Sequence, residues 1–202
     1  MNVYSGQTRI ARRTRAYAIR IICRVLFVLG SLALGYAGFG FGDSHLYQAV
    51  EIRKFERAAG PTKAQIFAEG DVLGEIQIPR LEMDSIVVQG DSNAALRRAI
   101  GHVSESALPG QQGNIVLAGH RDTFFRPLRN VRQGDEIVLK TGNGSFHYRV
   151  ESTEVVAPSD VQVMAPSNRY DLTFVTCFPF YFVGPAPKRF IVHAVEVDAA
   201  SR

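Results

Sequence analysis

The sequence predicts a mainly β domain, a barrel or sandwich of short strands, preceded by an N-terminal transmembrane helix. Seven short runs rich in β-branched residues follow residue 71, and turn residues separate them. Before them, an uncharged apolar segment follows a tail rich in arginine. The composition, with 46% hydrophobic and 21% charged residues, excludes a wholly disordered chain.

The net charge of +4 comes from the N-terminal tail, residues 1–20, and from its junction with the apolar segment. Six arginines lie in the first 24 residues, where no acidic residue occurs. Without these six, the 23 basic residues fall to 17 against 19 acidic ones, so the remaining chain is slightly acidic. The basic composition therefore predicts no nucleic-acid partner.

The apolar segment, residues 21–42, is predicted to be a transmembrane signal-anchor. From Val25 to Gly42 there are 18 residues without a charge, and counted from Ile21 the segment is just long enough to span a bilayer. Arginines before it and Asp43 after it predict a cytoplasmic N-terminus and an extracytoplasmic remainder in the cell membrane. A cleavable secretory signal is the alternative, although the apolar run is long for one. Both alternatives export the body of the protein.

Residues 43–70 are predicted to form a juxtamembrane helix and a linker, because Leu46, Val50 and Phe55 recur near helical spacing before Gly60-Pro61. Residues 71–202 hold the β domain. Its strand-like runs are residues 72–79, 85–90, 114–120, 136–140, 146–158, 171–177 and 189–197. A short helix is expected from Asp91 or Ser92 through Ile100, and a hairpin turn at residues 142–144.

Cys177 is the single cysteine of the exported part and ends an apolar strand. The other cysteine, Cys23, lies at the cytoplasmic edge of the apolar segment, so no structural disulfide between the two is expected. A lone thiol in an oxidising compartment is a liability unless it has a chemical role. The alternative, a buried cysteine that acts as a small hydrophobic residue, stays open on this argument.

An 11-residue loop, Phe178 to Lys188, follows Cys177 and carries four aromatic residues and three prolines. Two interpretations are open. The loop is a stiff wall of a groove for an extended apolar peptide, or its aromatic residues cap the end of the barrel.

His120 ends another apolar strand, directly after Gly119, which allows the backbone to approach a neighbour closely. An imidazole beside a thiol can stabilise the thiolate and later protonate a leaving amine. Arg189 opens the last strand, where a guanidinium can hydrogen-bond an oxyanion or a substrate carbonyl. A structural histidine and a surface arginine in an ion pair are the alternatives. Asp122 is expected to cap a helix rather than to orient His120.

Two stretches of the chain resemble the sortase family. Residues 107–139, ALPGQQGNIVLAGHRDTFFRPLRNVRQGDEIVL, resemble the family's histidine region. Residues 172–194, LTFVTCFPFYFVGPAPKRFIVHA, resemble its cysteine-to-arginine region and are most similar to class D sortases. The family's TLxTC signature appears as residues 173–177, TFVTC, with Phe174 in place of leucine. The resemblance covers about residues 72–197.

The resemblance implies an eight-stranded sortase-type β-barrel and a two-step acyl transfer. It makes Cys177 the nucleophile, His120 the acid/base residue and Arg189 the residue that steadies the substrate and the oxyanion. Thr176 and Val175 are expected along the bound substrate. The implied partners are surface proteins with a C-terminal LPXTG-like sorting signal and an amine acceptor, either a cell-wall precursor or a pilin lysine.

No cofactor or metal is expected, because cysteines and histidines are not clustered at ligand spacing. Some sortases use calcium, but no acidic cluster in this sequence requires it. Two other functions stay open: an exported cysteine protease that ends in hydrolysis, and a β-barrel binding module in which Cys177 has no chemical role. Aminolysis outpaces hydrolysis only where a site excludes enough water.

Overall fold

The computed structural model describes residues 20–36, 38, 46–53, 67–182 and 184–197. The chain divides into two compact units, Met1–Asp43 and Ser44–Arg202. Of the predicted segments, the following parts lie outside the described residues: the tail apart from Arg20, residues 37 and 39–42 of the predicted anchor, residues 43–45 and 54–66 of the predicted juxtamembrane helix and linker, and residues 183 and 198–202 of the β domain.

In the first unit, residues 20–36 are helical, and their apolar side chains are mostly exposed, as at Leu26, Phe27 and Leu34. Within the described part of the chain, no helix combines the length and the apolar character that crossing a bilayer requires.

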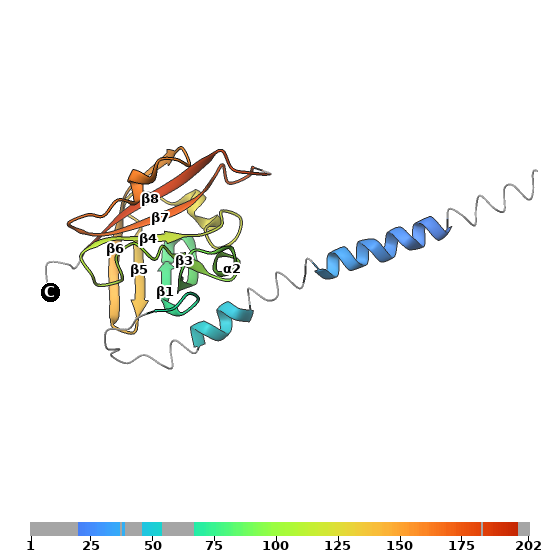
Figure 1. The fold of residues 1–202 in the computed structure, drawn as a ribbon, viewed down its shortest axis with the longest axis horizontal. Coiled ribbons are helices and arrows are strands. Elements are labelled where there is room, and N and C mark those ends of the chain that lie inside the picture. The colour runs from blue at the N-terminus through green and yellow to red at the C-terminus, as the bar shows by residue number, and fades with distance from the viewer. Residues whose placement is uncertain (1–19, 37, 39–45, 54–66, 183, 198–202) are drawn as a thin grey trace, which may run out of the picture. The chain divides into compact units, whose positions relative to one another are not determined.

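In the second unit, eight strands close into a barrel in the order β1-β2-β3-β4-β7-β8-β6-β5 (Figure 1). The strands are β1 Val72–Ile78, β2 Met83–Gln89, β3 Ile100–His102, β4 Gly113–Ala118, β5 Glu136–Thr141, β6 Gly144–Val156, β7 Tyr170–Phe178 and β8 Lys188–Glu196. The short helices η1 Pro79–Leu81, α2 Asn93–Leu96, η2 Arg126–Asn130 and η3 Val161–Met164 lie in the connections. The predicted mainly β fold and its eight-stranded closed barrel are confirmed, and the sandwich alternative is excluded.

Alternating side chains fill the interior of this barrel. Ile115 and Leu117 of β4 and Leu172 and Phe174 of β7 belong to the central core cluster. Because successive strand residues point to opposite faces, the residues that alternate with them, such as Val175 after Phe174, lie on the outer face. A barrel of eight strands has an interior that side chains can fill completely. The outer face and the rim are therefore the places where this fold can present chemistry.

The strand that the sequence did not predict is β3. The short helix expected through Ile100 is α2, which ends already at Leu96. Its N-cap is Ser92, whose Oγ accepts a hydrogen bond from the Ala95 amide at 3.3 Å. Ile100 already belongs to β3, which pairs parallel with β2 and antiparallel with β4. Three residues are too few to show the alternation by which a strand is predicted. The hairpin turn is confirmed, because Thr141 pairs directly with Gly144.

Residues 46–53 form a helix whose contacts differ from the predicted pattern. Tyr47 and Ile52 pack against a small core cluster beside β2, whereas Leu46 and Val50 are exposed. Gln48 helps to set this orientation, because its Oε1 accepts a hydrogen bond from a β2 backbone amide at 2.7 Å. Spacing of apolar residues alone could not reveal the contribution of a glutamine.

Candidate active site

Three strand ends meet where the sequence has its candidate residues. β4 and β7 are parallel and β8 is antiparallel to β7, so the ends of β4 and β7 and the start of β8 lie at one edge. Cys177 of β7 pairs directly with Arg189 of β8. Directly opposite residues share one face of a sheet, with Cβ atoms about 5 Å apart. Because Phe174 points into the core, the alternation puts Cys177 and Arg189 together on the outer face.

The segment with His120 is bound to β7 just before Cys177. The Gly119 amide donates a hydrogen bond to the Val175 carbonyl at 3.2 Å, and the Thr176 hydroxyl donates to the Gly119 carbonyl at 2.7 Å. The alignment of β4 with β7 therefore continues past the end of β4. The next residue, His120, comes level with Cys177 on strands that lie about 4.8 Å apart.

Contacts of the backbone fix the His120 segment further. The carbonyl of His120 accepts hydrogen bonds from the Phe125 amide at 3.1 Å and the Thr123 amide at 3.4 Å. Phe125 is fully buried, with its ring centroid 5.2 Å from that of Phe174. A Cβ atom on Gly119 would lie 2.7 Å from the Phe125 ring. The close approach that the sequence predicts at Gly119 is confirmed, and its neighbour is this ring.

One expectation beside the site, the helix cap at Asp122, needs correction. Thr176 is only 3% exposed and its hydroxyl bonds Gly119, so its side chain has almost no surface with which to contact a substrate. The Thr176 hydroxyl ties β7 to the histidine segment, and the place of Thr176 along the bound substrate stays a prediction. Val175 is half-buried on the outer face, and its contact with substrate stays a prediction. Asp122 is exposed and caps no helix, because η2 begins after Phe125 without a side-chain cap.

The three candidate side chains are half-buried. Cys177 is a free thiol. Arg189 Nη1 donates to the Lys188 and Ala186 carbonyls at 3.1 and 3.4 Å. Within the described residues Arg189 has no acidic partner. The alternative that the sequence left open for Arg189, a surface arginine in an ion pair, is therefore not what these residues show. Part of its fork of donors thus stays available for a ligand.

The aromatic residues after Cys177 divide between the two interpretations that the sequence left open. Phe178, Phe180 and Phe190 contact one another, with ring centroids 5.3 to 6.3 Å apart, and Phe180 and Phe190 pack against the core. They cap the barrel. Tyr181 is 77% exposed and Phe182 is 44% exposed, so these two residues form the outer part of the loop.

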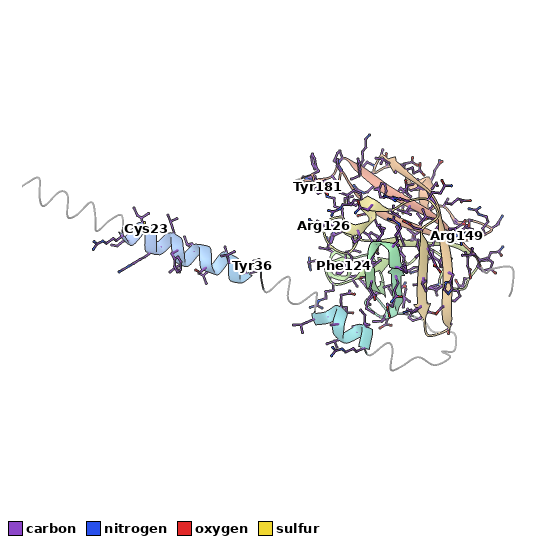
Figure 2. All side chains as sticks on the ribbon, turned by 180° about the vertical axis from the view of Figure 1, so that it is seen from behind. Cys23, Tyr36, Phe124, Arg126, Arg149 and Tyr181 are labelled. Carbon is purple, nitrogen blue, oxygen red and sulfur yellow. The ribbon has the colours of Figure 1, made fainter. Side chains whose placement is uncertain are left out.

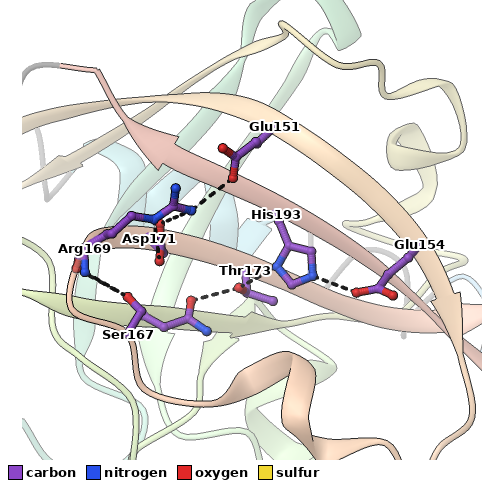
Figure 3. A network of polar contacts seen from close by, with 8 residues as sticks. Glu151, Glu154, Ser167, Arg169, Asp171, Thr173 and His193 are labelled. Atoms are coloured by element: carbon purple, nitrogen blue, oxygen red, sulfur yellow. Dashed lines mark hydrogen bonds and ion pairs between the residues drawn. The ribbon is translucent and has the colours of Figure 1, made fainter.

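Farther along the outer face, a chain of polar contacts joins four strands (Figure 3). Glu154 Oε1 lies 3.0 Å from His193 Nε2, and His193 Nδ1 lies 3.3 Å from Thr173 Oγ1. The Thr173 hydroxyl in turn donates to Asn114 Oδ1 at 2.8 Å. His193 pairs with Thr173, four residues from Cys177 along the strands, or about 13 Å. His193 is therefore too far away to serve as the partner of Cys177.

This network also fixes the connection between β6 and β7. Asn114 Nδ2 donates to the Ala165 carbonyl at 3.2 Å. Beside it, Arg169 Nη2 bonds Glu151 at 3.0 Å and lies 3.1 Å from Asp171 (Figure 3). The hydrogen bond from Arg169 lowers the pKa of Glu151 below its usual value.

A groove of about 590 Å³ opens beside the network. It is lined by the loop after β3, by Asn114 and Val116 of β4, and by η3 with the residues that follow it. Val116 is four residues before His120, or about 13 Å along an extended strand. The groove therefore lies on the same face as the candidate residues, at the distance of a short extended peptide.

His102 supports one wall of this groove and was not singled out by the sequence. It is 1% exposed, and its Nδ1 lies 2.9 Å from Gln89 Oε1. Its Nε2 lies 2.9 Å from the Ala107 carbonyl and 3.0 Å from Ser106 Oγ. Burial lowers the pKa of His102. A histidine in a three-residue strand gives no sequence signal that separates it from the other four.

Among the described residues, no group of three or more His, Cys, Asp or Glu side chains is arranged to hold a metal ion.

Comparisons with known proteins identify a family and several relatives. The Sortase domain family model matches residues 76–197. Sortase D of Bacillus subtilis is 29% identical over 195 residues, which cover 88% of this chain and 98% of that protein. Sortase A from Corynebacterium diphtheriae has a solved structure with 33% identity and a TM-score of 0.60, covering 65% of this chain and 63% of that one.

The fold alone is also shared with a Sortase D5 transpeptidase of Clostridium perfringens, at a TM-score of 0.67 and 24% identity over 77% of this chain and 99% of that chain. The family match includes β4, β7 and β8, whose ends carry the candidate residues. This chain belongs to the sortase family of cysteine transpeptidases.

Proposed function

We propose that Cys177, His120 and Arg189 carry out a two-step acyl transfer on an LPXTG-like sorting signal. The observation that carries the proposal is the register of three strand ends. Cys177 lies opposite Arg189 in the β7–β8 pair, and hydrogen bonds of Gly119 hold the His120 segment beside it. A nucleophile, an acid/base group and an oxyanion donor are the three groups that acyl transfer needs.

In the first step, the thiolate of Cys177 attacks the carbonyl carbon of threonine in the sorting signal. Arg189 donates hydrogen bonds to the oxyanion that forms, at the point where negative charge develops. The bond between this carbon and the following nitrogen then breaks. His120 gives its proton to the departing amine, and the acyl group remains on Cys177 as a thioester.

In the second step, an amine of a cell-wall precursor or a pilin lysine attacks the thioester carbon. The amine gives up a proton to His120, and Cys177 leaves as the thiolate, which restores the starting enzyme. Water can attack the same carbon, so the yield of transfer depends on how well the site excludes it.

The sorting peptide lies along the outer face of β4 and β7 in this proposal. An extended peptide advances about 3.3 Å per residue, so the leucine of the signal lies about 10 Å from the threonine bound at Cys177. Followed back along the strands, this distance leads past Val175 toward Val116, at the edge of the groove. Val175 is then a substrate contact, and the groove accepts the apolar start of the signal.

Anchoring in the cell membrane through residues 21–42, with a cytoplasmic N-terminus, completes the proposal. Its support is the uncharged run from Val25 to Gly42 behind six arginines. The two cysteines provide the test. In intact cells, a membrane-impermeant maleimide should label Cys177 and reach Cys23 only after lysis. Labelling of both, or of neither, in intact cells contradicts this orientation.

The transfer itself is tested with the full chain in detergent and quenched LPXTG and LPXTA peptides, with and without an amine acceptor. We expect a ligated product that requires the amine, and a loss of at least about 10³-fold in Cys177→Ala. Cleavage that the amine does not change would indicate a hydrolase. No cleavage of any sorting peptide, together with a thiol at Cys177 that resists alkylation, would favour a binding module.

A further inference from the structure

Arg121, the residue after His120, joins two segments of the active site. Its Nη2 donates to the Phe182 carbonyl at 2.6 Å and to the Gly184 carbonyl at 3.1 Å. Its guanidinium carbon also lies 5.9 Å from the centroid of the Phe182 ring, a cation–π contact. Phe182 and Gly184 belong to the loop between β7 and β8, so Arg121 connects this loop to the histidine segment.

A second arginine reaches the same loop from η2. The guanidinium carbon of Arg129 lies 5.6 Å from the centroid of the Tyr181 ring. Tyr181 is 77% exposed and Phe182 is 44% exposed, so the core covers neither ring fully. In Figure 2, Tyr181 and Arg126, which lies on the same segment as the two contacting arginines, stand at one edge of the barrel.

The two parts of the loop are held in different ways. Phe178, the last residue of β7, and Phe180 both contact Phe190, and Phe180 also packs against the barrel core. In the outer part of the loop, Tyr181, Phe182 and Gly184 are contacted by arginines from the segment after β4. An arginine that bonds two carbonyls at once fixes their positions more strictly than a point charge does. Loss of Arg121 should therefore release the outer part of the loop while the barrel remains folded.

We propose that Arg121 is a positioning residue that holds the outer part of the β7–β8 loop against the His120 segment and so shields the thioester on Cys177 from water. This inference rests on the proposed two-step transfer and deepens it. The β7–β8 loop lies between Phe178, which follows Cys177, and Lys188, which precedes Arg189, so its position sets how open the reacting carbon is to solvent. With the loop released, water competes better with the amine.

The test uses the full chain in detergent with Arg121→Gln, Arg121→Lys and the matched control Arg126→Gln, which removes an equal charge from an exposed side chain nearby. We expect Arg121→Gln to lower the ratio of transfer to hydrolysis by about tenfold, the order expected when a hydrogen bond to a charged group is lost. Arg121→Lys should fall in between, because it keeps the charge but not the fork. Arg126→Gln should stay within about twofold of the wild type.

Hydrogen exchange gives a readout that is independent of activity. The Phe182 amide donates to the Pro179 carbonyl at 3.3 Å, and it should exchange about tenfold faster in Arg121→Gln. Unchanged exchange and an unchanged ratio in this variant overturn the proposal. Faster exchange with an unchanged ratio overturns the shielding role, since Arg121 then only orders the loop. Absence of transfer in the wild type would instead refute the proposed function, whatever the exchange shows.

Discussion

The outer face of β7 and β8 has two ends that use the same residue types differently. At one end, Asn114, Thr173, His193 and Glu154 form a continuous chain of contacts of 2.8 to 3.3 Å. At the other end, Cys177 is a free thiol, opposite an arginine that bonds backbone carbonyls. One end uses its polar groups within the protein, and the other keeps them available for a ligand.

This difference shows that residue type alone does not identify a catalytic group. Each end has a histidine, His193 or His120, and an arginine, Arg169 or Arg189. His193 and Arg169 have carboxylate partners at 3.0 Å. The His120 segment is instead fixed through its backbone, which leaves the ring available. The comparison predicts a separation of effects, in which changes at one end alter catalysis and changes at the other end alter stability.

The histidines give the largest predicted contrast. His120→Gln should lower the rate of thioester formation by about 10² to 10⁴-fold, because the leaving amine loses its proton donor. The free energy of unfolding should change by less than about 0.5 kcal/mol. His193→Gln should keep the rate within about threefold and lower stability by up to about 1 kcal/mol, since its partner Glu154 is exposed. Single-turnover kinetics measure the rate of thioester formation, and urea denaturation measures the free energy of unfolding. An equal loss of rate in the two variants would contradict the comparison.

The arginines give the next contrast. Arg189→Lys should lower kcat/KM by about 10² to 10³-fold, because a point charge replaces the fork of donors to the oxyanion. Arg169→Gln should leave kcat/KM unchanged and cost about 0 to 1 kcal/mol of stability, since Arg169 and Glu151 are both exposed. The pKa of Glu151 should also rise toward its ordinary value, because the hydrogen bond that lowers it is removed. A loss of activity in Arg169→Gln would show that the polar network around His193 also affects the transfer reaction.

Strand alternation made most of the fold predictable from sequence. The long strands β6, β7 and β8 show period-2 patterns, and the Asn143-Gly144 pair marks the β5–β6 hairpin. β3 was missed because it has three residues. The order of strands was also out of reach, because the parallel pairing of β4 with β7 joins segments about 57 residues apart. Closure into a barrel came from family resemblance rather than from periodicity.

The candidate site was predictable by position but not by contact. Cys177, His120 and Arg189 stand at strand ends in the sequence. In the structure Cys177 and Arg189 lie at the ends of β7 and β8, whereas His120 lies two residues beyond the end of β4. The burial of Thr176 follows from the parity of β7, which puts it on the inner side together with Phe174. The sequence offered no signal for Arg121, whose partners are backbone carbonyls 61 and 63 residues away. Contacts to backbone groups leave no pattern in residue types.

A smaller effect is predicted for a substitution of Thr173, which lies in the polar network between Asn114 and His193. Thr173→Val keeps the shape but removes the hydroxyl that donates to Asn114 Oδ1, leaving a buried acceptor without that donor. The expected cost is about 1 to 3 kcal/mol in the free energy of unfolding. KM for the sorting peptide should rise, because Asn114 also holds Ala165 beside the groove. Thr173→Ser is the matched control, since it keeps the hydroxyl. If Val and Ser cost the same, the methyl group rather than the hydrogen bond is what stabilises this position.

The smallest predicted effect is a pH dependence from His102, which belongs to neither end. Burial lowers the pKa of His102, whereas a histidine in an unfolded chain titrates near about 6.5. Below that pH the unfolded chain binds a proton that the folded chain does not, so stability falls as the pH drops toward the folded pKa. For one proton the slope is at most about 1.4 kcal/mol per pH unit. Above about pH 7.5 both states are neutral and the contribution is constant.

Urea denaturation at pH 5.5 and 7.5 measures this effect, with His102→Gln as the control. The variant should lose stability at both pH values, and the difference between them should shrink. Asp135 does not cause the same effect, because the hydrogen bond from Arg80 lowers the pKa of Asp135. The stability that Asp135 contributes is therefore lost only below about pH 4. An undiminished difference in His102→Gln would contradict the assignment of this pH dependence to His102.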